Sequence, residues 1–314
     1  MLLGSRGPMR LASQPRMTTT KWIFLALDAP LGAASRSWFE GTCPETAAGL
    51  SDTEFCARLS RASRFAPRGA LMPTETERRA AAEAVPGVEI ERWTTLETVR
   101  VALVLSRDDL AEESAQRALE TAFRFADEGE LCALYRSLAH LPDAGRFAWR
   151  AGEGCRTNMK SVFEAVACDT PFPARHFDDV AFRQLAIKAV FIGAPLWRVV
   201  GLDGRIDEEL ARMALDLVEE RRSAGRAVQP ELWLCLGAHA GERGLRALEA
   251  EITSGTEPLG RLAAVLALAR AGAVERVAEL ARTGPPELRD VARLALERRD
   301  AGVFRLLTSS PSVR

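Results

Sequence analysis

Apolar residues recur along most of the chain with the three-to-four-residue spacing of amphipathic helices. In the segment 95–105, Leu96, Val99 and Leu103 fall on one helical face, and Trp93 stands just before them. Signals for β-strands are sparse, because the chain has a single tyrosine, no Asn-Gly turn and few alternating runs of Val, Ile and Thr. The pattern predicts an all-α protein, built as a multi-helix bundle or an α-solenoid-like array.

Turn and cap residues divide this pattern into separate helices. The segment 110–126 is followed by Gly129, and the segment 131–141 stops at Pro142, whose ring cannot continue the helical backbone. The Gly-rich stretch 151–154 is interpreted as a joint before the next helix. Further helices are predicted over residues 157–167, 180–192, 207–223 and 230–236.

Two of these helices supply the predicted core. Met159 and Phe163 belong to an apolar stripe at helical spacing, which we expect to be buried. The helix 180–192 is apolar on nearly every side, a pattern typical of a helix at the centre of a bundle. We therefore expect Met159, Phe163, Phe182 and Leu185 to pack together in one interior.

Beyond Gly241 the composition shifts to Ala, Leu, Arg and Glu, and a faint repeat begins. Pro258 and Arg261 recur as Pro286 and Arg289, and 286 minus 258 gives a period of 28 residues. Two helical hairpins resembling short HEAT units would produce this pattern, each burying its Ala/Leu face against its neighbour. Alanine-rich helices also imitate a repeat by composition alone, so both interpretations stay open.

These patterns predict three regions. Residues 1–20 are rich in Gly, Ser and Pro and lack acidic residues, which is typical of a disordered or leader-like tail, or of a start codon upstream of Met17. Residues 21–240 are expected to form a helical domain and residues 241–314 a HEAT-like C-terminal region. The apolar run 22–27 is far shorter than the roughly 20 residues that cross a bilayer, so no transmembrane span is expected.

Composition narrows the classes of function. Of the 314 residues, 47% are hydrophobic and 27% charged, and the formal net charge of -1 supplies no long-range field for nucleic acid, which is not an expected partner. The six cysteines are dispersed and the three histidines isolated, so neither a metal site nor a histidine-based nucleophile is predicted. Dispersed thiols are typical of the cytoplasm. Nucleotide-binding and hydrolase motifs are missing from the sequence, and no cofactor is expected.

Charged residues around position 160 allow two interpretations. Arg156, Lys160 and Glu164 stand four residues apart, which fits a solvated helix edge with an ion pair. Alternatively, the backbone N–H groups of Thr157 and Asn158 at a helix start, together with Arg156, would bind an anion.

A second polar stripe lies on the otherwise apolar helix 180–192, where Gln184 and Lys188 share one face. Burying an unpaired ammonium is costly, so Lys188 should have a close acidic or carbonyl partner, such as Glu164 or Asp203. This pairing would serve either the stability of the core or a ligand pocket.

The sequence Asp203-Gly204-Arg205 is most simply a turn, in which Asp bonds the backbone and Gly supplies a positive φ. Its two charged side chains complete the set of candidates for a ligand-binding pocket. That set is Arg156, Asn158, Glu164, Gln184, Lys188, Asp203 and Arg205. No catalytic residue set is predicted.

Several short stretches stand out by their order and spacing. They are Arg61-Ala-Ser-Arg64-Phe-Ala-Pro-Arg68, Arg156-Thr-Asn158-Met-Lys-Ser-Val-Phe-Glu164-Ala-Val-Ala, Pro171-Phe-Pro173, Gln184-Leu-Ala-Ile-Lys188-Ala-Val-Phe191, Gly201-Leu-Asp203, Leu210-Ala-Arg212-Met213 and Pro230-Glu-Leu-Trp233. From roughly Ser51 to Gly237 these stretches resemble the EboA family of bacterial and algal proteins. The chain departs from that family at Asp169-Thr170 and at Ile206-Asp207, where the family commonly has Asn, which weakens any pocket built on asparagine side chains.

The resemblance implies a helical protein without an assigned reaction. It implies a gene beside those of a prenyltransferase, a TatD-like hydrolase, a sugar-phosphate-cyclase-like enzyme and a TIM-barrel isomerase-like enzyme, in clusters linked to making or exporting secondary metabolites. We expect a non-enzymatic accessory, scaffold or metabolite-binding protein, whose partners are co-encoded pathway enzymes or a small anionic metabolite. The alternative is an enzyme that uses Lys188 with Glu164 or Asp203 as an acid-base pair on an anionic or prenylated intermediate.

Overall fold

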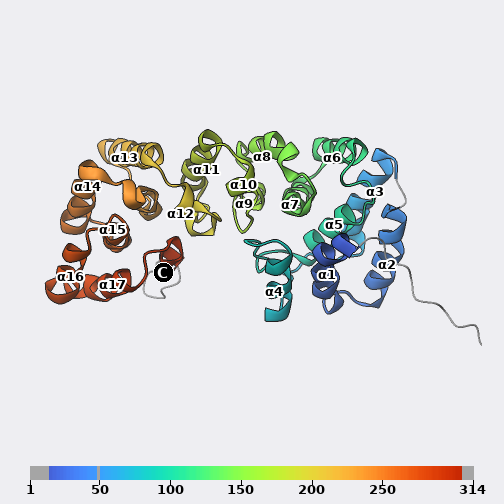
Figure 1. The fold of residues 1–314 in the computed structure, drawn as a ribbon, viewed down its shortest axis with the longest axis horizontal. Helices are drawn as coiled ribbons and strands as arrows, with labels where there is room; N and C mark the ends of the chain where they lie inside the picture. Colours follow the sequence, from blue (N-terminus) through green and yellow to red (C-terminus); the bar gives the residue numbers. More distant parts are fainter. Residues whose placement is uncertain (1–13, 48–49, 306–314) are drawn as a thin grey trace, which may run out of the picture. The chain divides into compact units, whose positions relative to one another are not determined.

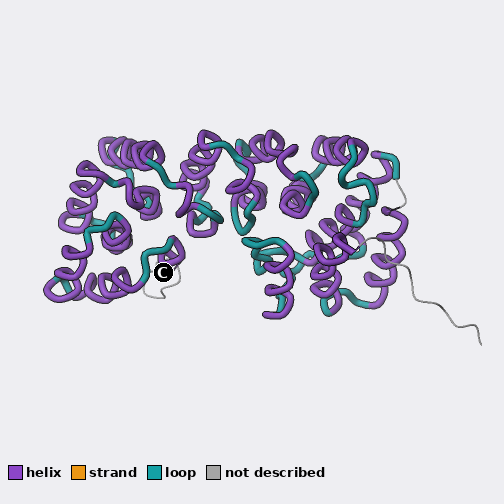
Figure 2. The backbone as a smooth tube through the Cα atoms, viewed as in Figure 1, coloured by secondary structure: helices purple, strands orange, loops and turns teal. Residues whose placement is uncertain are grey.

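A computed structural model describes residues 14–47 and 50–305 of the chain. Within these residues the regular secondary structure is helical, and β pairing is limited to one isolated bridge between Ala70 and Thr94 (Figures 1 and 2). The prediction of an all-α protein is confirmed. Of the predicted tail, residues 1–13 lie outside the described residues, and helix begins at Gln14.

The chain divides into two compact units, the first ending at Phe147 and the second beginning at Ala148. The helix predicted over 95–105 is observed end to end, whereas the one predicted to reach residue 141 ends at Ser137 and continues as a 3-10 turn. The α-helices of the first unit are α1 (Gln14–Asp28), α2 (Ala33–Ala47), α3 (Asp52–Arg61), α4 (Glu75–Ala84), α5 (Thr95–Leu105), α6 (Glu113–Phe125) and α7 (Glu128–Ser137), and its 3-10 helices are η1 (Ala62–Arg64), η2 (Leu138–His140) and η3 (Ala144–Phe147).

Helix α5 forms the centre of the first unit. It contacts α1, α2, α3 and α7, and all of its residues except Glu97 are buried, as is typical of a helix at the centre of a bundle. Glu97 instead closes a capping box, because its carboxylate accepts a hydrogen bond from the Thr94 backbone N–H at 2.7 Å. The one buried guanidinium of α5, that of Arg100, donates to the Leu59 carbonyl at 3.0 Å and lies 3.4 Å from Glu130, which offsets its desolvation.

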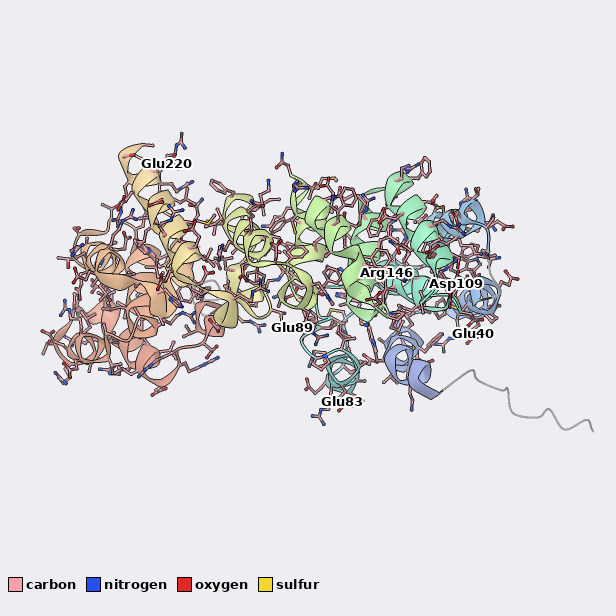
Figure 3. All side chains as sticks on the ribbon, turned by 45° about the horizontal axis from the view of Figure 1, so that its top comes forward. Glu40, Glu83, Glu89, Asp109, Arg146 and Glu220 are labelled. Carbon is pink, nitrogen blue, oxygen red and sulfur yellow. The ribbon has the colours of Figure 1, made fainter. Side chains whose placement is uncertain are left out.

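Arginine side chains also fix the loop between α5 and α6. Figure 3 labels Asp109 of this loop and Arg146. Arg107 donates to both carboxylate oxygens of Asp109, at 2.9 and 2.7 Å. Arg146 of η3 donates to the backbone carbonyls of Leu110 and Ala111, the two residues directly after Asp109. These contacts tie the last turn of the first unit to the entry of α6.

An aromatic cluster with one histidine lies in the interior of the first unit. The ring centroids of Trp22 and Trp93 are 5.6 Å apart, and that of His140 is 5.5 Å from Trp22. Within residues 14–47 and 50–305, neither ring nitrogen of His140 has a hydrogen-bond partner, and burial lowers the pKa of the imidazole to about 4. His140 is therefore neutral in the folded protein at neutral pH.

The second unit is built from helices α8 to α17 and the 3-10 helices η4 to η6. Helix α13 extends to Ser223 as predicted, with Asp207 as its cap, because the Asp207 carboxylate accepts from Leu210 N–H at 2.8 Å. Its elements are α8 (Ala148–Cys155), α9 (Lys160–Ala167), α10 (Phe172–His176), α11 (Asp179–Ile192), η4 (Leu196–Arg198), α12 (Leu202–Arg205), α13 (Glu208–Ser223), η5 (Pro230–His239), α14 (Gly241–Ser254), α15 (Pro258–Arg270), α16 (Val274–Thr283), α17 (Pro286–Glu297) and η6 (Ala301–Phe304).

Three predictions for this unit were wrong in detail. The Gly-rich stretch 151–154 lies inside α8 and is not a joint. Met159 is 42% exposed, because it precedes α9 with extended backbone and does not join the buried stripe that contains Phe163. Helix α11 is not fully enclosed, since Val180 and Phe191 are more than half exposed, although Phe182 and Leu185 are buried.

The C-terminal half of the second unit consists of helices that pack in pairs. Helices α13 and η5, α14 and α15, and α16 and α17 pack in pairs, and α15 also packs against η5 and α17 (Figure 1). Proline opens η5, α15 and α17, and 258 minus 230 gives the same 28-residue period that separates Pro258 from Pro286. The ion pair Arg243–Asp216 joins α14 to α13, and the ion pair Arg276–Glu249 joins α16 to α14. Each residue of the second pair lies 33 positions after its counterpart in the first pair. The assignment of these hairpins to the HEAT type remains a prediction.

We predict that His140 makes the first unit sensitive to acid. The pKa of its imidazole is 6.5 when the chain is unfolded and about 4 when it is folded. The free energy of unfolding is therefore highest above pH 6.5 and decreases by about 3 kcal/mol as the pH falls to 4. His140→Phe keeps an aromatic ring in the cluster and removes this titration. Urea denaturation followed by circular dichroism should show that wild type loses about 3 kcal/mol more than the variant between pH 7 and pH 4. An equal loss in both proteins would refute the assignment.

Candidate functional site

The residues predicted to form one ligand pocket fall into separate groups within the second unit. In one group, the Lys188 ammonium on α11 donates a hydrogen bond to the side-chain carbonyl of Asn158 at 2.7 Å. Gln184, one turn earlier on α11, is exposed. Lys188 thus has a carbonyl partner, and that partner is an amide instead of Glu164 or Asp203.

Arg156 lies apart from this pair. It is 70% exposed in the turn after α8 and forms an ion pair with Glu153. Helix α9 begins at Lys160, so the backbone amides of Thr157 and Asn158 precede the helix and do not lie at its positive end. Thr157 and Asn158 therefore do not form the predicted anion site at a helix start.

Arg205 on α12 connects three elements. Its guanidinium donates to the backbone carbonyls of Ala174 at 2.9 Å and Phe177 at 3.1 Å, and to the Asp179 carboxylate at 2.9 Å. It also lies 4.6 Å from the ring centroid of Phe182. With its donors directed at α10 and the start of α11, Arg205 holds the fold together at this point.

Asp203, also on α12, lines a polar cavity of about 270 Å³. Its carboxylate pairs with Arg270 at the end of α15, whose side chain is 5% exposed and also donates to the Arg299 carbonyl at 2.7 Å. His239 and Arg299 also line this cavity. Asp203 therefore neutralises a buried guanidinium.

Glu164 belongs to a network of buried charges that the sequence analysis missed. Arg198 on η4 and Asp169, whose side chains are 5% and 1% exposed, form a forked ion pair with distances of 3.1 and 2.6 Å to Asp169 Oδ2. The remaining Arg198 Nη1 donates to Glu164 at 2.6 Å, and the Lys160 ammonium lies 3.8 Å from the other Glu164 oxygen. The backbones of these two residues are also hydrogen-bonded, because the Asp169 N–H donates to the Arg198 carbonyl at 2.9 Å.

Asp169 suits this position for conformational and electrostatic reasons. Its φ of 59° lies in the left-handed region, which Asp and Asn adopt more readily than other non-glycine residues. Burial alone would lower the pKa of Arg198, but the hydrogen bonds and negative charge of Asp169 outweigh burial and raise it. No local signal in the sequence pointed to the pairing of Asp169 with Arg198, because the two residues are 29 positions apart.

The other end of η4 holds a second buried carboxyl group, that of Glu231 at the start of η5. Its Oε2 accepts a hydrogen bond from the Leu196 backbone N–H at 2.7 Å, and no described residue donates to its buried Oε1. Burial raises the pKa of Glu231 to about 7, against the opposing effects of the Leu196 hydrogen bond and the Lys160 charge. Glu231 therefore titrates near neutral pH.

Glu231 lines a largely apolar cavity of about 280 Å³. Gln229 lines it too, and its buried Oε1 has no hydrogen-bond partner in the part of the chain that the structure describes. A concave apolar site with a few polar groups is the usual form of a small-molecule site. The remaining walls come from Val190, Gly193, Ala194, Pro195, Pro230, Leu259 and Phe304.

The turn after α11 gives this cavity its shape. Gly193 ends α11 in the left-handed conformation with a φ of 70°, and a Cβ placed there would lie 3.8 Å from the Lys160 ammonium. Its backbone N–H donates to the Val190 carbonyl at 3.3 Å, which closes the helix. The chain then runs through Ala194 and Pro195 along the cavity to Leu196.

A family model described as metabolite traffic protein EboA matches residues 19–237, well over half of the chain. The chain belongs to the EboA family. No significant match was found among curated proteins or among solved structures. The EboA match includes Asp169, Arg198, Glu231 and the α11 wall of the cavity, whereas Leu259 and Phe304 lie beyond it.

The described residues contain neither a membrane-spanning helix nor a cluster of metal-binding side chains. No helix within 14–47 and 50–305 is both long enough and apolar enough to cross a bilayer. Within the same residues, His, Cys, Asp and Glu side chains form no group of three or more suited to hold a metal ion.

We predict that Arg198→Met, which removes the charge and keeps much of the apolar volume, destabilises this EboA-family chain by about 3 to 5 kcal/mol. The reason is that Asp169, 1% exposed, would remain buried without its cation. Urea denaturation at pH 7 measures the loss.

The matched control is Arg293→Met on α17. Arg293 pairs with Asp290 at 2.6 Å, but both side chains are exposed, so the expected loss is below about 0.5 kcal/mol. Similar losses in the two variants would show that the buried network does not stabilise the fold as argued.

Proposed function

We propose that the protein is a non-enzymatic accessory protein of metabolite traffic that binds a small apolar metabolite in the cavity beside Glu231. The observation that carries this proposal is the cavity itself, with apolar walls and two acceptor oxygens that no described residue satisfies. Membership of a family described as metabolite traffic proteins supports the same role.

The size and lining of the cavity define what it would take. Its volume of about 280 Å³ is near the lower end of known ligand sites, so it suits a small molecule or the apolar end of a larger one. Transfer of apolar surface from water to Leu259 and Phe304 would drive binding. Because Glu231 brings a carboxyl group to the cavity, a prenyl-like or uncharged body fits better than the small anionic metabolite expected from the sequence.

The acid-base alternative has less support. It needs Lys188 beside a carboxylate, but the Lys188 ammonium is bonded to Asn158. Glu164 and Asp203, its proposed partners, are engaged by Arg198 and Arg270. A cytoplasmic location and transfer of the ligand to co-encoded pathway enzymes remain part of the proposal.

Filling the cavity should abolish binding. Leu259→Trp adds an indole to the wall, so its affinity for hexan-1-ol should fall about tenfold or more relative to wild type, as measured by ligand-observed NMR titration. The matched control is Val180→Trp, which adds similar bulk at an exposed position of α11 that is not part of the cavity wall, and should change the affinity by less than about twofold.

Circular dichroism melts would establish that both variants are folded. The proposal fails if wild type binds neither hexan-1-ol nor the amine with the same chain, hexylamine, or if hexan-1-ol binds the two variants equally well.

A further inference from the structure

Two residues that line the same cavity each have a side-chain acceptor oxygen without a donor. Glu231 Oε1 and Gln229 Oε1 are both buried, and within the described residues neither has a hydrogen-bond partner. Buried polar atoms in folded proteins are nearly always satisfied, so an unsatisfied pair in one cavity indicates donors that come from a bound molecule.

None of the nearby groups in the described residues donates a hydrogen bond to these two oxygens. The Leu196 N–H already donates to Glu231 Oε2. The charged or titratable groups whose fields reach Glu231 are Lys160 on α9 and Cys235 on η5 itself. Lys160 is more than half exposed and lies 3.8 Å from Glu164, while burial raises the pKa of the Cys235 thiol to about 12 and keeps it neutral.

The number of acceptors distinguishes between ligand head groups. Two acceptors need at least two donors from the ligand. A hydroxyl group has one donor and a carboxylate has none, whereas an ammonium group has three. An ammonium donating to a carboxylate also makes a charge-assisted bond, which is stronger than a neutral one.

Resting on the proposed function, we infer that the metabolite is an amine: its ammonium group donates to Glu231 and Gln229, and its apolar body lies against Val190, Leu259 and Phe304. The ion pair is formed only when Glu231 is ionised. Binding should therefore strengthen as the pH rises through neutrality and level off above it, because Glu231 has a pKa of about 7 in the free protein.

The test compares hexylamine, hexan-1-ol and hexanoate, which share one apolar chain, by NMR titration at pH 8. Hexylamine should bind about tenfold more tightly than hexan-1-ol, and hexanoate should bind most weakly. Between pH 8 and pH 6 the affinity for hexylamine should fall about tenfold, while that for hexan-1-ol should stay nearly constant.

Glu231→Gln keeps the size of the side chain and removes its charge, so the preference for hexylamine over hexan-1-ol should disappear. The matched control is Glu242→Gln on α14, which makes the same change in charge at an exposed position and should retain the preference. If Glu231→Gln does not fold, the pH dependence of the affinity of wild type for hexylamine tests the same inference.

The outcomes separate this inference from the proposed function. If none of the three compounds binds, the cavity is not a ligand site and both proposals fail. If all three bind equally, or if hexanoate binds best, the cavity is a ligand site but the amine inference is overturned.

Discussion

The buried ion pair between Arg198 and Asp169 is the constraint on which the second unit depends. These two residues are separated by 29 positions in the sequence. The Arg198 side chain donates to the Asp169 carboxylate, and the Asp169 backbone N–H donates to the Arg198 carbonyl. The pair fixes η4, a single 3-10 turn too short to be stable by itself. Because Leu196 at the start of η4 donates to Glu231, the same constraint places one wall of the cavity.

The other charges of the second unit are largely satisfied within the protein. Arg205 is directed at backbone carbonyls and Asp179, Lys188 at Asn158, and Asp203 at Arg270. A paired charge has little capacity left for a ligand, since binding would have to replace an existing bond. The cavity beside Glu231 differs because its polar oxygens gain bonds when a donor enters.

Local signals in the sequence determined how much of the fold was predictable. Helices α5 and α13 were predicted closely, because Thr94 and Asp207 are strong cap residues before a clear apolar period. Met159 was wrongly placed in the core, since periodicity alone does not reveal that α9 starts at Lys160, three residues after the predicted start. The candidate site was harder to predict, because the pairing of Arg198 with Asp169 and of Glu231 with Leu196 joins positions 29 and 35 residues apart.

Burial explains why Glu231 titrates near neutrality, because it raises the pKa to about 7 against the opposing effects of the Leu196 hydrogen bond and the Lys160 charge. The Leu196 N–H engages only Oε2, and no described residue donates to Oε1, so the protein gives the ionised carboxylate little further support. A donor brought by a ligand would favour the ionised form, and its binding would therefore lower the pKa of Glu231. Binding and titration at this carboxyl group are thus coupled, and the pH of the solution and the occupancy of the cavity each shift the other.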